Sequence, residues 1–215
     1  MNKVLWMAWF QGENDPSIPI LNKHCIQEWR RLNPDWDINV LTNNNISEYV
    51  PEFFEIIENS PDRSWAAKSD LLRILSLSKY GGVWVDASVY PVMPLNEFYD
   101  EIVNHTKFFT YRFIPRSLSE NGNRETVSWF LCVDRVNHPL INLWKKAFVD
   151  KFQNLKTWKY FAFHETLCEL YDNDNQVKFI IDNMVQIDEK IPHSALQSWK
   201  HRRRESYMYK RPLLY

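Results

Sequence analysis

The sequence reads Ser69-Asp70-Leu71-Leu72-Arg73 and, shortly afterwards, Lys79-Tyr80-Gly81-Gly82-Val83-Trp84-Val85-Asp86-Ala87-Ser88. The first run places an acid and a base one helical turn apart, so both side chains lie on the same face of a helix. The paired glycines predict the end of that helix, because a left-handed residue commonly follows the last turn. An apolar strand then leads directly into Asp86. Open α/β sheets carry ligand-binding groups at the carboxyl ends of their strands, so this stretch predicts both an α/β fold and a site.

The composition excludes several classes of protein. With 215 residues, 45% of them hydrophobic and 25% charged, the chain is long enough for one globular domain with a full core. A net charge of −1 gives no electrostatic reason to expect nucleic acid as a partner. Only four glycines are present, so the glycine-rich fingerprints of Rossmann dehydrogenases and P-loop kinases are excluded.

Two further features bear on location. The opening apolar run, 4–10, is far too short to span a bilayer and indicates a buried first strand, so we expect no integral membrane span. The three cysteines lack metal-type spacing, which is typical of a reducing compartment. We therefore expect a cytoplasmic protein, or one that acts in a host cytoplasm if the chain is viral.

Strands alternate with helices along the chain, which predicts an α/β fold: a single domain whose central, mainly parallel mixed sheet is flanked by helices. The predicted strands are 3–9, 37–41, 83–85, 89–93, 108–111 and 127–133. The predicted helices are 18–32, a short one ending at 49, 52–57, 65–80, 139–153 and 161–171.

Three segments are less regular. The polar stretch 112–126 indicates a mobile loop, and 178–181 with 185–187 are predicted to pair as late strands. The chain is expected to divide into a domain at 1–199 and a basic tail at 200–215. That tail is a solvated surface, or else it closes over the ligand, contacts a membrane surface or begins a connection to a further domain of the same chain.

The helix pair Asp70 and Arg73 has two interpretations. Such a pair is often a surface salt bridge that contributes little. Here it precedes the Gly-Gly turn and lies among apolar residues, so it can instead bind two sugar hydroxyls by charge-assisted hydrogen bonds.

Asp86 is either the cap of a turn or a ligand for a divalent cation or a ribose hydroxyl. A hard cation such as Mn²⁺ or Mg²⁺ neutralises a diphosphate leaving group when a carboxylate holds it. Ser88 points to the same side as Asp86 if the chain stays extended. Because a hydroxyl is a weaker ligand than a carboxylate, such a site holds metal loosely without nucleotide.

These motifs resemble the capsular-polysaccharide-synthesis glycosyltransferases. That set is related to the DXD-sugar transferases, which include the yeast initiating mannosyltransferases and the glucosylating toxins. The resemblance rests mainly on S-D-L-L-R, K-Y-G-G and V-W-V-D-A-S between residues 69 and 88. The opening W-x-x-W-F-Q-G, the S-W-F at 128–130 and the Y-F-A-F-H at 160–164 also fit.

The resemblance implies a GT-A fold and a nucleotide-sugar donor with Mn²⁺ or Mg²⁺. It implies that Asp70 and Arg73 hold the donor sugar and that Asp86 and position 88 hold ribose and metal. The sequence departs from D-x-D there, because position 88 is serine. The resemblance assigns the binding of the nucleotide base to Trp9, Phe10 and Gln11.

Four further residues complete the predicted site. The resemblance implies that His193 completes the metal shell, although a lone histidine is more often a surface or core residue. It also implies that His164 lines the active site. Trp129 and Phe130 either shape the acceptor side or pack in the core.

The sequence thus predicts a hexosyltransferase that moves a sugar from a nucleoside diphosphate sugar, most simply a UDP-sugar, to a glycan hydroxyl. The resemblance implies retention of configuration, with the leaving phosphate taking the proton. Two alternatives stay open: a degenerate module that binds nucleotide or glycan without chemistry, which Ser88 favours, and a metal-dependent phosphohydrolase that uses Asp70 and Asp86.

Overall fold

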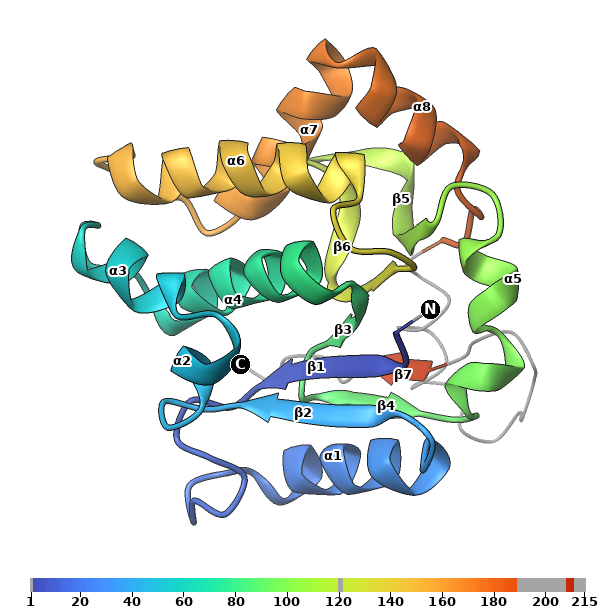
Figure 1. Ribbon diagram of the computed structural model, residues 1–215. Coiled ribbons are helices and arrows are strands. Elements are labelled where there is room, and N and C mark those ends of the chain that lie inside the picture. Colours follow the sequence, from blue (N-terminus) through green and yellow to red (C-terminus); the bar gives the residue numbers. More distant parts are fainter. Residues whose placement is uncertain (1, 120–121, 189–207, 211–215) are drawn as a thin grey trace.

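The computed structural model describes residues 2–119, 122–188 and 208–210 (Figure 1). At its centre lies a five-stranded sheet with the spatial order β2-β1-β3-β6-β5. β1 pairs in parallel with both β2 and β3, whereas β6 pairs antiparallel with β3 and β5. The strands are β1 (Val4–Ala8), β2 (Asp37–Leu41), β3 (Gly82–Val85), β5 (Phe108–Ser119) and β6 (Gly122–Val133).

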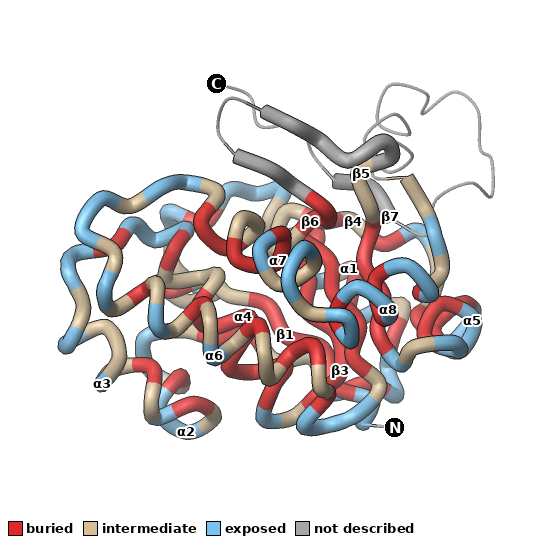
Figure 2. The backbone as a smooth tube through the Cα atoms, turned by 90° about the horizontal axis from the view of Figure 1, so that it is seen from above, coloured by how far each residue is buried: buried red, intermediate tan, exposed pale blue. Residues whose placement is uncertain are grey.

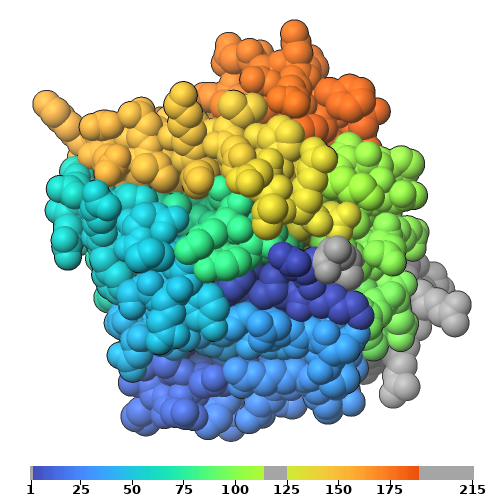
Figure 3. All heavy atoms as spheres, in the orientation of Figure 1, coloured from blue at the N-terminus to red at the C-terminus, as the bar shows by residue number. Residues whose placement is uncertain are grey.

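Helices cover both faces of this sheet, which confirms the predicted α/β fold. α4, α6, α7 and α8 supply the core on one face, and α1 and α5 supply it on the other. The helices are α1 (Ile20–Leu32), α2 (Ile46–Tyr49), α3 (Glu52–Glu58), α4 (Trp65–Tyr80), the 3₁₀ turn η1 (Leu95–Glu97), α5 (Tyr99–Val103), α6 (Pro139–Asn154), α7 (Ala162–Asn173) and α8 (Asn175–Asn183). In the space-filling view, α6 to α8 (yellow to orange) lie above α2 to α4 (cyan to green) (Figure 3).

Alternation along the central strands decides which side chains meet which helices. In β1, Leu5 and Met7 pack with the α1 side of the core, while Trp6 packs with the α4 side. In β3, Val83 and Val85 likewise face the α1 side, and Trp84 faces the α4 side. Trp84 is therefore positioned beneath the helix that carries the predicted acid–base pair. Figure 2 shows the buried backbone concentrated in the strands and in the helix segments that face them.

The turn between α4 and β3 requires its two glycines. Gly81 and Gly82 have φ of 67° and 87°. Residues other than glycine rarely adopt this backbone conformation. A Cβ at Gly82 would also lie 2.3 Å from the backbone oxygen of Val4. The pair therefore ends α4, as the sequence predicted, and allows β3 to begin directly against β1.

Two expectations were wrong. The stretch 112–126 is not a loop: β5 and β6 extend through most of it as a long antiparallel pair with irregular register. Residues 178–181 do not form a strand, because they lie within α8. That helix begins where the side chain of Asp174 accepts hydrogen bonds from the backbone N–H groups of Gln176 and Val177. Residues 185–187 form no strand either.

Other predicted elements agree with the structure, including the helix at 65–80 and the strand at 37–41. β4 (Val89–Pro91) and β7 (Met208–Lys210) form a separate antiparallel pair. β7 belongs to the basic segment 200–215, and the rest of that segment lies outside the described residues. Among the helices that the structure describes, none is long and apolar enough to cross a membrane.

Candidate functional site

Helix α4 places Asp70 and Arg73 above the end of β3. The helix begins at Ser64, whose hydroxyl accepts a hydrogen bond from the Ala67 N–H at 3.3 Å, and this contact fixes its first turn. It ends at Gly81. Since the next residues form β3, the same short stretch of chain delivers the helix pair and Asp86 to one place.

Arg73 joins the two acids. Its Nη1 donates to Oδ1 of Asp70, and its Nη2 donates to Oδ1 of Asp86 at 2.8 Å. The Arg73 side chain is only 4% exposed, whereas those of Asp70 and Asp86 are 13% and 28% exposed. A buried cation thus lies behind two carboxylates that reach the surface, which is an arrangement suited to binding a polar ligand.

Two aromatic rings pack against the guanidinium. The Arg73 Cζ lies 5.0 Å from the centroid of Trp84 and 5.4 Å from that of Phe163. Cation–π contacts of this kind are favourable and are stronger when water is excluded. The indole Nε1 of Trp84 also donates to Oδ1 of Asp86 at 3.2 Å. Trp84 therefore orients both the arginine and the carboxylate.

The Nε–H of Arg73 is buried and has no hydrogen-bond partner among the described residues. A buried donor without a partner costs free energy, so such groups are uncommon unless a ligand or water satisfies them. This observation is consistent with a site that is completed by a bound molecule.

The chain does not stay extended after Asp86, which corrects the geometry assumed for Ser88. Asp86 donates its backbone N–H to the Trp129 oxygen, and its own carbonyl accepts from the Val89 N–H, both at 2.9 Å. Residues 86–89 therefore form a turn, and the period-two argument that placed Ser88 beside Asp86 fails. Both side chains remain partly exposed within this turn.

The residues that the structure describes contain no cluster of three or more His, Cys, Asp or Glu side chains able to hold a metal ion. Magnesium in particular often binds through one or two protein carboxylates, with substrate phosphates and water supplying the other ligands. Asp86, with Ser88 in the same turn, fits a cation shared with a diphosphate better than a preformed metal centre. His193, the third predicted ligand, lies outside the described residues.

The three residues predicted to hold the base lie just beyond β1. Gln11 is exposed and Trp9 is half-buried, with an indole N–H that has no partner among the described residues. Phe10 is buried, and its ring centroid is 4.8 Å from that of Trp65. Trp65, at the start of α4, is 55% exposed and was not singled out from the sequence.

The residues predicted for the acceptor side are divided between core and surface. Trp129 and Phe130 are buried in the core, where Trp129 stacks on Tyr111 with centroids 5.0 Å apart. His164 is half-buried in the first turn of α7, beside Phe163. The His164 ring contacts that of Phe163, which packs on Arg73, while the Trp129 backbone oxygen accepts a hydrogen bond from the Asp86 N–H.

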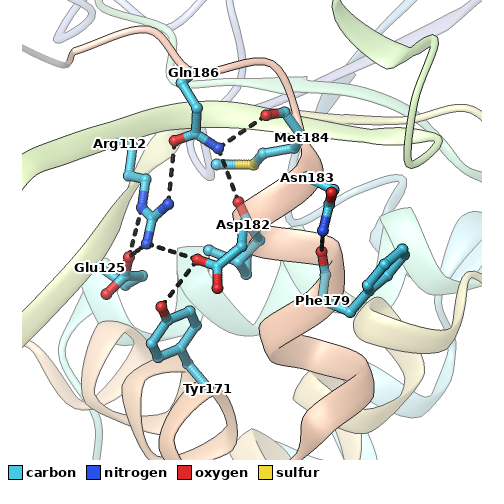
Figure 4. A network of polar contacts seen from close by, with 9 residues as sticks. Arg112, Glu125, Tyr171, Phe179, Asp182, Asn183, Met184 and Gln186 are labelled. Carbon is cyan, nitrogen blue, oxygen red and sulfur yellow. Dashed lines mark hydrogen bonds and ion pairs between the residues drawn. The ribbon is translucent and has the colours of Figure 1, made fainter.

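A second arginine that joins two carboxylates, Arg112, was not predicted from the sequence. Arg112 on β5 binds Glu125 on β6, with Nε to Oε1 at 2.6 Å, and its Nη2 reaches Asp182 on α8 at 3.2 Å (Figure 4). Nη1 reaches Gln186 at 3.2 Å, and the Tyr171 hydroxyl donates to Asp182 at 2.9 Å. These partners are up to 74 residues apart in the sequence, and no local motif signals their meeting.

The fold with this site at the end of β3 is that of the GT-A glycosyltransferases. A solved structure titled PaToxG Glycosyltransferase matches with a TM-score of 0.50 and 16% sequence identity, covering 83% of this chain and 73% of that one. At this identity the likeness concerns the fold alone.

The chain belongs to the family described as capsular polysaccharide synthesis protein, whose model matches residues 1–210. It is also 32% identical over 101 residues to the O-glycosyltransferase braB of Annulohypoxylon truncatum, covering 41% of this chain and 23% of that protein. The glycosyltransferase afumC of Aspergillus fumigatus is 30% identical over 97 residues, covering 40% of this chain and 24% of that protein. The matched segment thus spans about a quarter of each relative.

Proposed function

We propose that this chain is a glycosyltransferase that moves a hexose-type sugar from a nucleoside diphosphate sugar, taken to be a UDP-sugar, to a hydroxyl of a glycan. The observation that carries the proposal is the buried Arg73, held between two partly exposed carboxylates at the end of β3. Family membership and the glycosyltransferase names of the relatives support it.

Each residue of the site has a role in this proposal. The Asp70 carboxylate accepts hydrogen bonds from hydroxyls of the donor sugar and fixes the sugar's orientation. The positive charge of Arg73 stabilises the negative charge that develops as the bond to the diphosphate breaks, and it does so in a water-poor setting where such charges act strongly. Asp86, already oriented by Trp84, binds the ribose and the cation.

The metal role is part of the same proposal. Asp86 and Ser88 would hold Mn²⁺ or Mg²⁺ together with the diphosphate, and the ion supplies neutralisation of the leaving group. His193 is the proposed third protein ligand. Trp9, Phe10 and Gln11 would contact the base, with Trp9 offering the indole N–H that has no partner among the described residues.

We further propose retention of configuration, with the leaving phosphate accepting the proton of the acceptor hydroxyl. A cytoplasmic location fits three cysteines that lack metal-type spacing and are all buried. The acceptor glycan and further domains of a longer chain are the expected partners.

Thermal unfolding tests the proposal. The protein is heated with UDP, GDP, CDP, dTDP or ADP, each with and without Mn²⁺. A nucleotide at about 100 times its dissociation constant stabilises the folded state by about 2.7 kcal/mol, which raises the midpoint by roughly 5 to 10 °C for a domain of this size.

A rise in the unfolding midpoint with one nucleotide that requires Mn²⁺ supports the proposal, and a metal-independent rise removes the metal role of Asp86. No rise with any nucleotide contradicts it. Phosphate release from simple phosphoesters would indicate a phosphohydrolase instead.

A further inference from the structure

A strip of aromatic side chains leads from the surface to Arg73. We call Tyr160, Phe161 and His164 the aromatic strip. The rings of Tyr160 and Phe161 meet edge to face with centroids 4.9 Å apart, and those of Phe161 and His164 are 5.6 Å apart. His164 in turn lies 6.1 Å from Phe163, whose ring packs 5.4 Å from the Arg73 Cζ. Each ring thus contacts the next from the surface to the site.

Burial changes steadily along this path. Tyr160 is 65% exposed, Phe161 and His164 are half-buried, and Phe163 is fully buried. The strip therefore presents ring surface to solvent, and the buried ring of Phe163 connects it to Arg73. An aromatic ring combines an apolar face with, for tyrosine, a hydroxyl able to form hydrogen bonds. These are the two features that a sugar ring requires of a binding surface.

The backbone that carries the strip is held at two points. Before it, Trp158 packs over the buried guanidinium of Arg63, with the Cζ 4.6 Å from the ring centroid. Between Phe161 and His164, Phe163 stacks on Trp144 of α6 with centroids 4.1 Å apart. Tyr160 is thus presented by a short segment between two packed aromatic contacts. A binding surface built on such a frame loses little conformational entropy when a ligand binds.

We propose that the aromatic strip binds the terminal sugar of the acceptor glycan by stacking, with Tyr160 as the main contact. The inference rests on the proposed function, because it takes Asp70 and Arg73 as the place where the donor sugar lies. In a transferase the acceptor hydroxyl must approach the donor carbon from close by. The ring contacts described above join the strip to Arg73. We therefore place the acceptor sugar on the strip.

The test measures sugar binding separately from nucleotide binding. Saturation-transfer NMR is recorded on the full chain with maltose, cellobiose, lactose and N,N′-diacetylchitobiose, and UDP with Mn²⁺ is titrated by calorimetry. Tyr160→Ala is expected to weaken binding of the preferred disaccharide by about five- to tenfold, the scale of one lost aromatic contact. Tyr160→Trp is expected to restore it. Neither variant is expected to change the affinity for UDP.

Phe179→Ala is the matched control, because Phe179 on α8 is 64% exposed, nearly the same as Tyr160. It is expected to leave disaccharide binding unchanged. The inference is overturned if the wild type binds none of the four disaccharides, or if Phe179→Ala weakens binding as much as Tyr160→Ala. Disaccharide binding that depends on Tyr160 in a protein that fails to bind any nucleotide would support the strip and contradict the proposed function.

Discussion

Arg73 and Arg112 each join two carboxylates, but they do so in different parts of the molecule. Arg73 connects Asp70 and Asp86 within a helix, a turn and a strand that follow one another in the sequence. Arg112 connects Glu125 and Asp182 across β5, β6 and α8. Glu125 is 1% exposed, so one carboxylate of Arg112 is fully buried although Asp182 is 39% exposed, whereas both carboxylates on Arg73 are partly exposed. We therefore propose that similar ion pairs form a ligand site in one region and a structural connection in the other.

The largest expected effect is on catalysis. Arg73→Ala removes the charge proposed to stabilise the leaving group, and transfer is expected to fall by about a thousandfold or more. The measurement is sugar transfer to water or to a glycan under saturating donor, with far-ultraviolet circular dichroism to confirm folding. Arg112→Ala, assayed where it is folded, is expected to retain activity. Wild-type turnover in Arg73→Ala would remove that residue from the site.

The reverse pattern is expected for stability. Arg112→Ala leaves the deeply buried Glu125 without its arginine, and losing one partner of a buried ion pair is strongly destabilising. Because Arg112 is itself 18% exposed, we expect the free energy of unfolding to fall by about 3 kcal/mol rather than more. Urea unfolding measures this. A loss as large in Arg73→Ala, whose carboxylate partners can be hydrated, would erase the distinction between the two regions.

A matched pair of amide variants sharpens the comparison. Asp86→Asn keeps an oxygen for Trp84 and Arg73 but removes the charge proposed to bind the cation and the ribose, so nucleotide binding with Mn²⁺ is expected to weaken about tenfold or more. Glu125→Gln is expected to cost about 1 to 2 kcal/mol of stability and to leave nucleotide binding intact. Calorimetric titration measures the nucleotide affinity of each variant, and urea unfolding measures the free energy of unfolding of each. If Glu125→Gln weakened nucleotide binding instead, the Arg112 network would belong to the site.

The smallest expected effect is a loss of folding stability at acid pH, which we attribute to His138. Burial lowers the pKa of His138, which lies at the start of α6 and donates Nε2–H to the Thr106 oxygen at 2.9 Å. The unfolded chain therefore binds more protons than the folded one near the ordinary histidine pKa. Stability is full above about pH 6.5 and falls as the pH drops below it, by about 1.4 kcal/mol for each unit of depression. Urea unfolding at pH 7.5 and 5.5 measures the loss, and His138→Gln should reduce it. An equal loss in His138→Gln would assign the effect elsewhere.

The same comparison explains how much the sequence could predict. Asp70, Arg73 and Asp86 lie within one helix–turn–strand unit, so local spacing was enough to bring them together. The Arg112 network depends on cross-strand pairing and on α8, which local patterns do not determine. The polar residues of 112–126 suggested a loop, but pairing between β5 and β6 overrode that preference.

A missed signal accounts for the other error. Asp174 precedes Val177, Ile180 and Ile181, all of which are buried on one face of α8. A capping residue followed by apolar residues at this spacing is typical of a helix start. The region was instead assigned by its short apolar runs, which helices and strands share. Ser88 was misplaced for a related reason: the turn at 86–89 is set by a contact with Trp129 in β6.

The most direct test of the central claim compares donor cleavage in three proteins: the wild type, Arg73→Lys and Arg112→Lys. Release of free nucleoside diphosphate is followed with UDP-glucose, UDP-galactose, UDP-N-acetylglucosamine and GDP-mannose in the presence of Mn²⁺. The account predicts that the wild type cleaves at least one donor, that Arg73→Lys loses about a hundredfold or more because lysine cannot bridge two carboxylates in fixed geometry, and that folded Arg112→Lys cleaves at close to the wild-type rate. Equal rates in Arg73→Lys and the wild type would contradict the account.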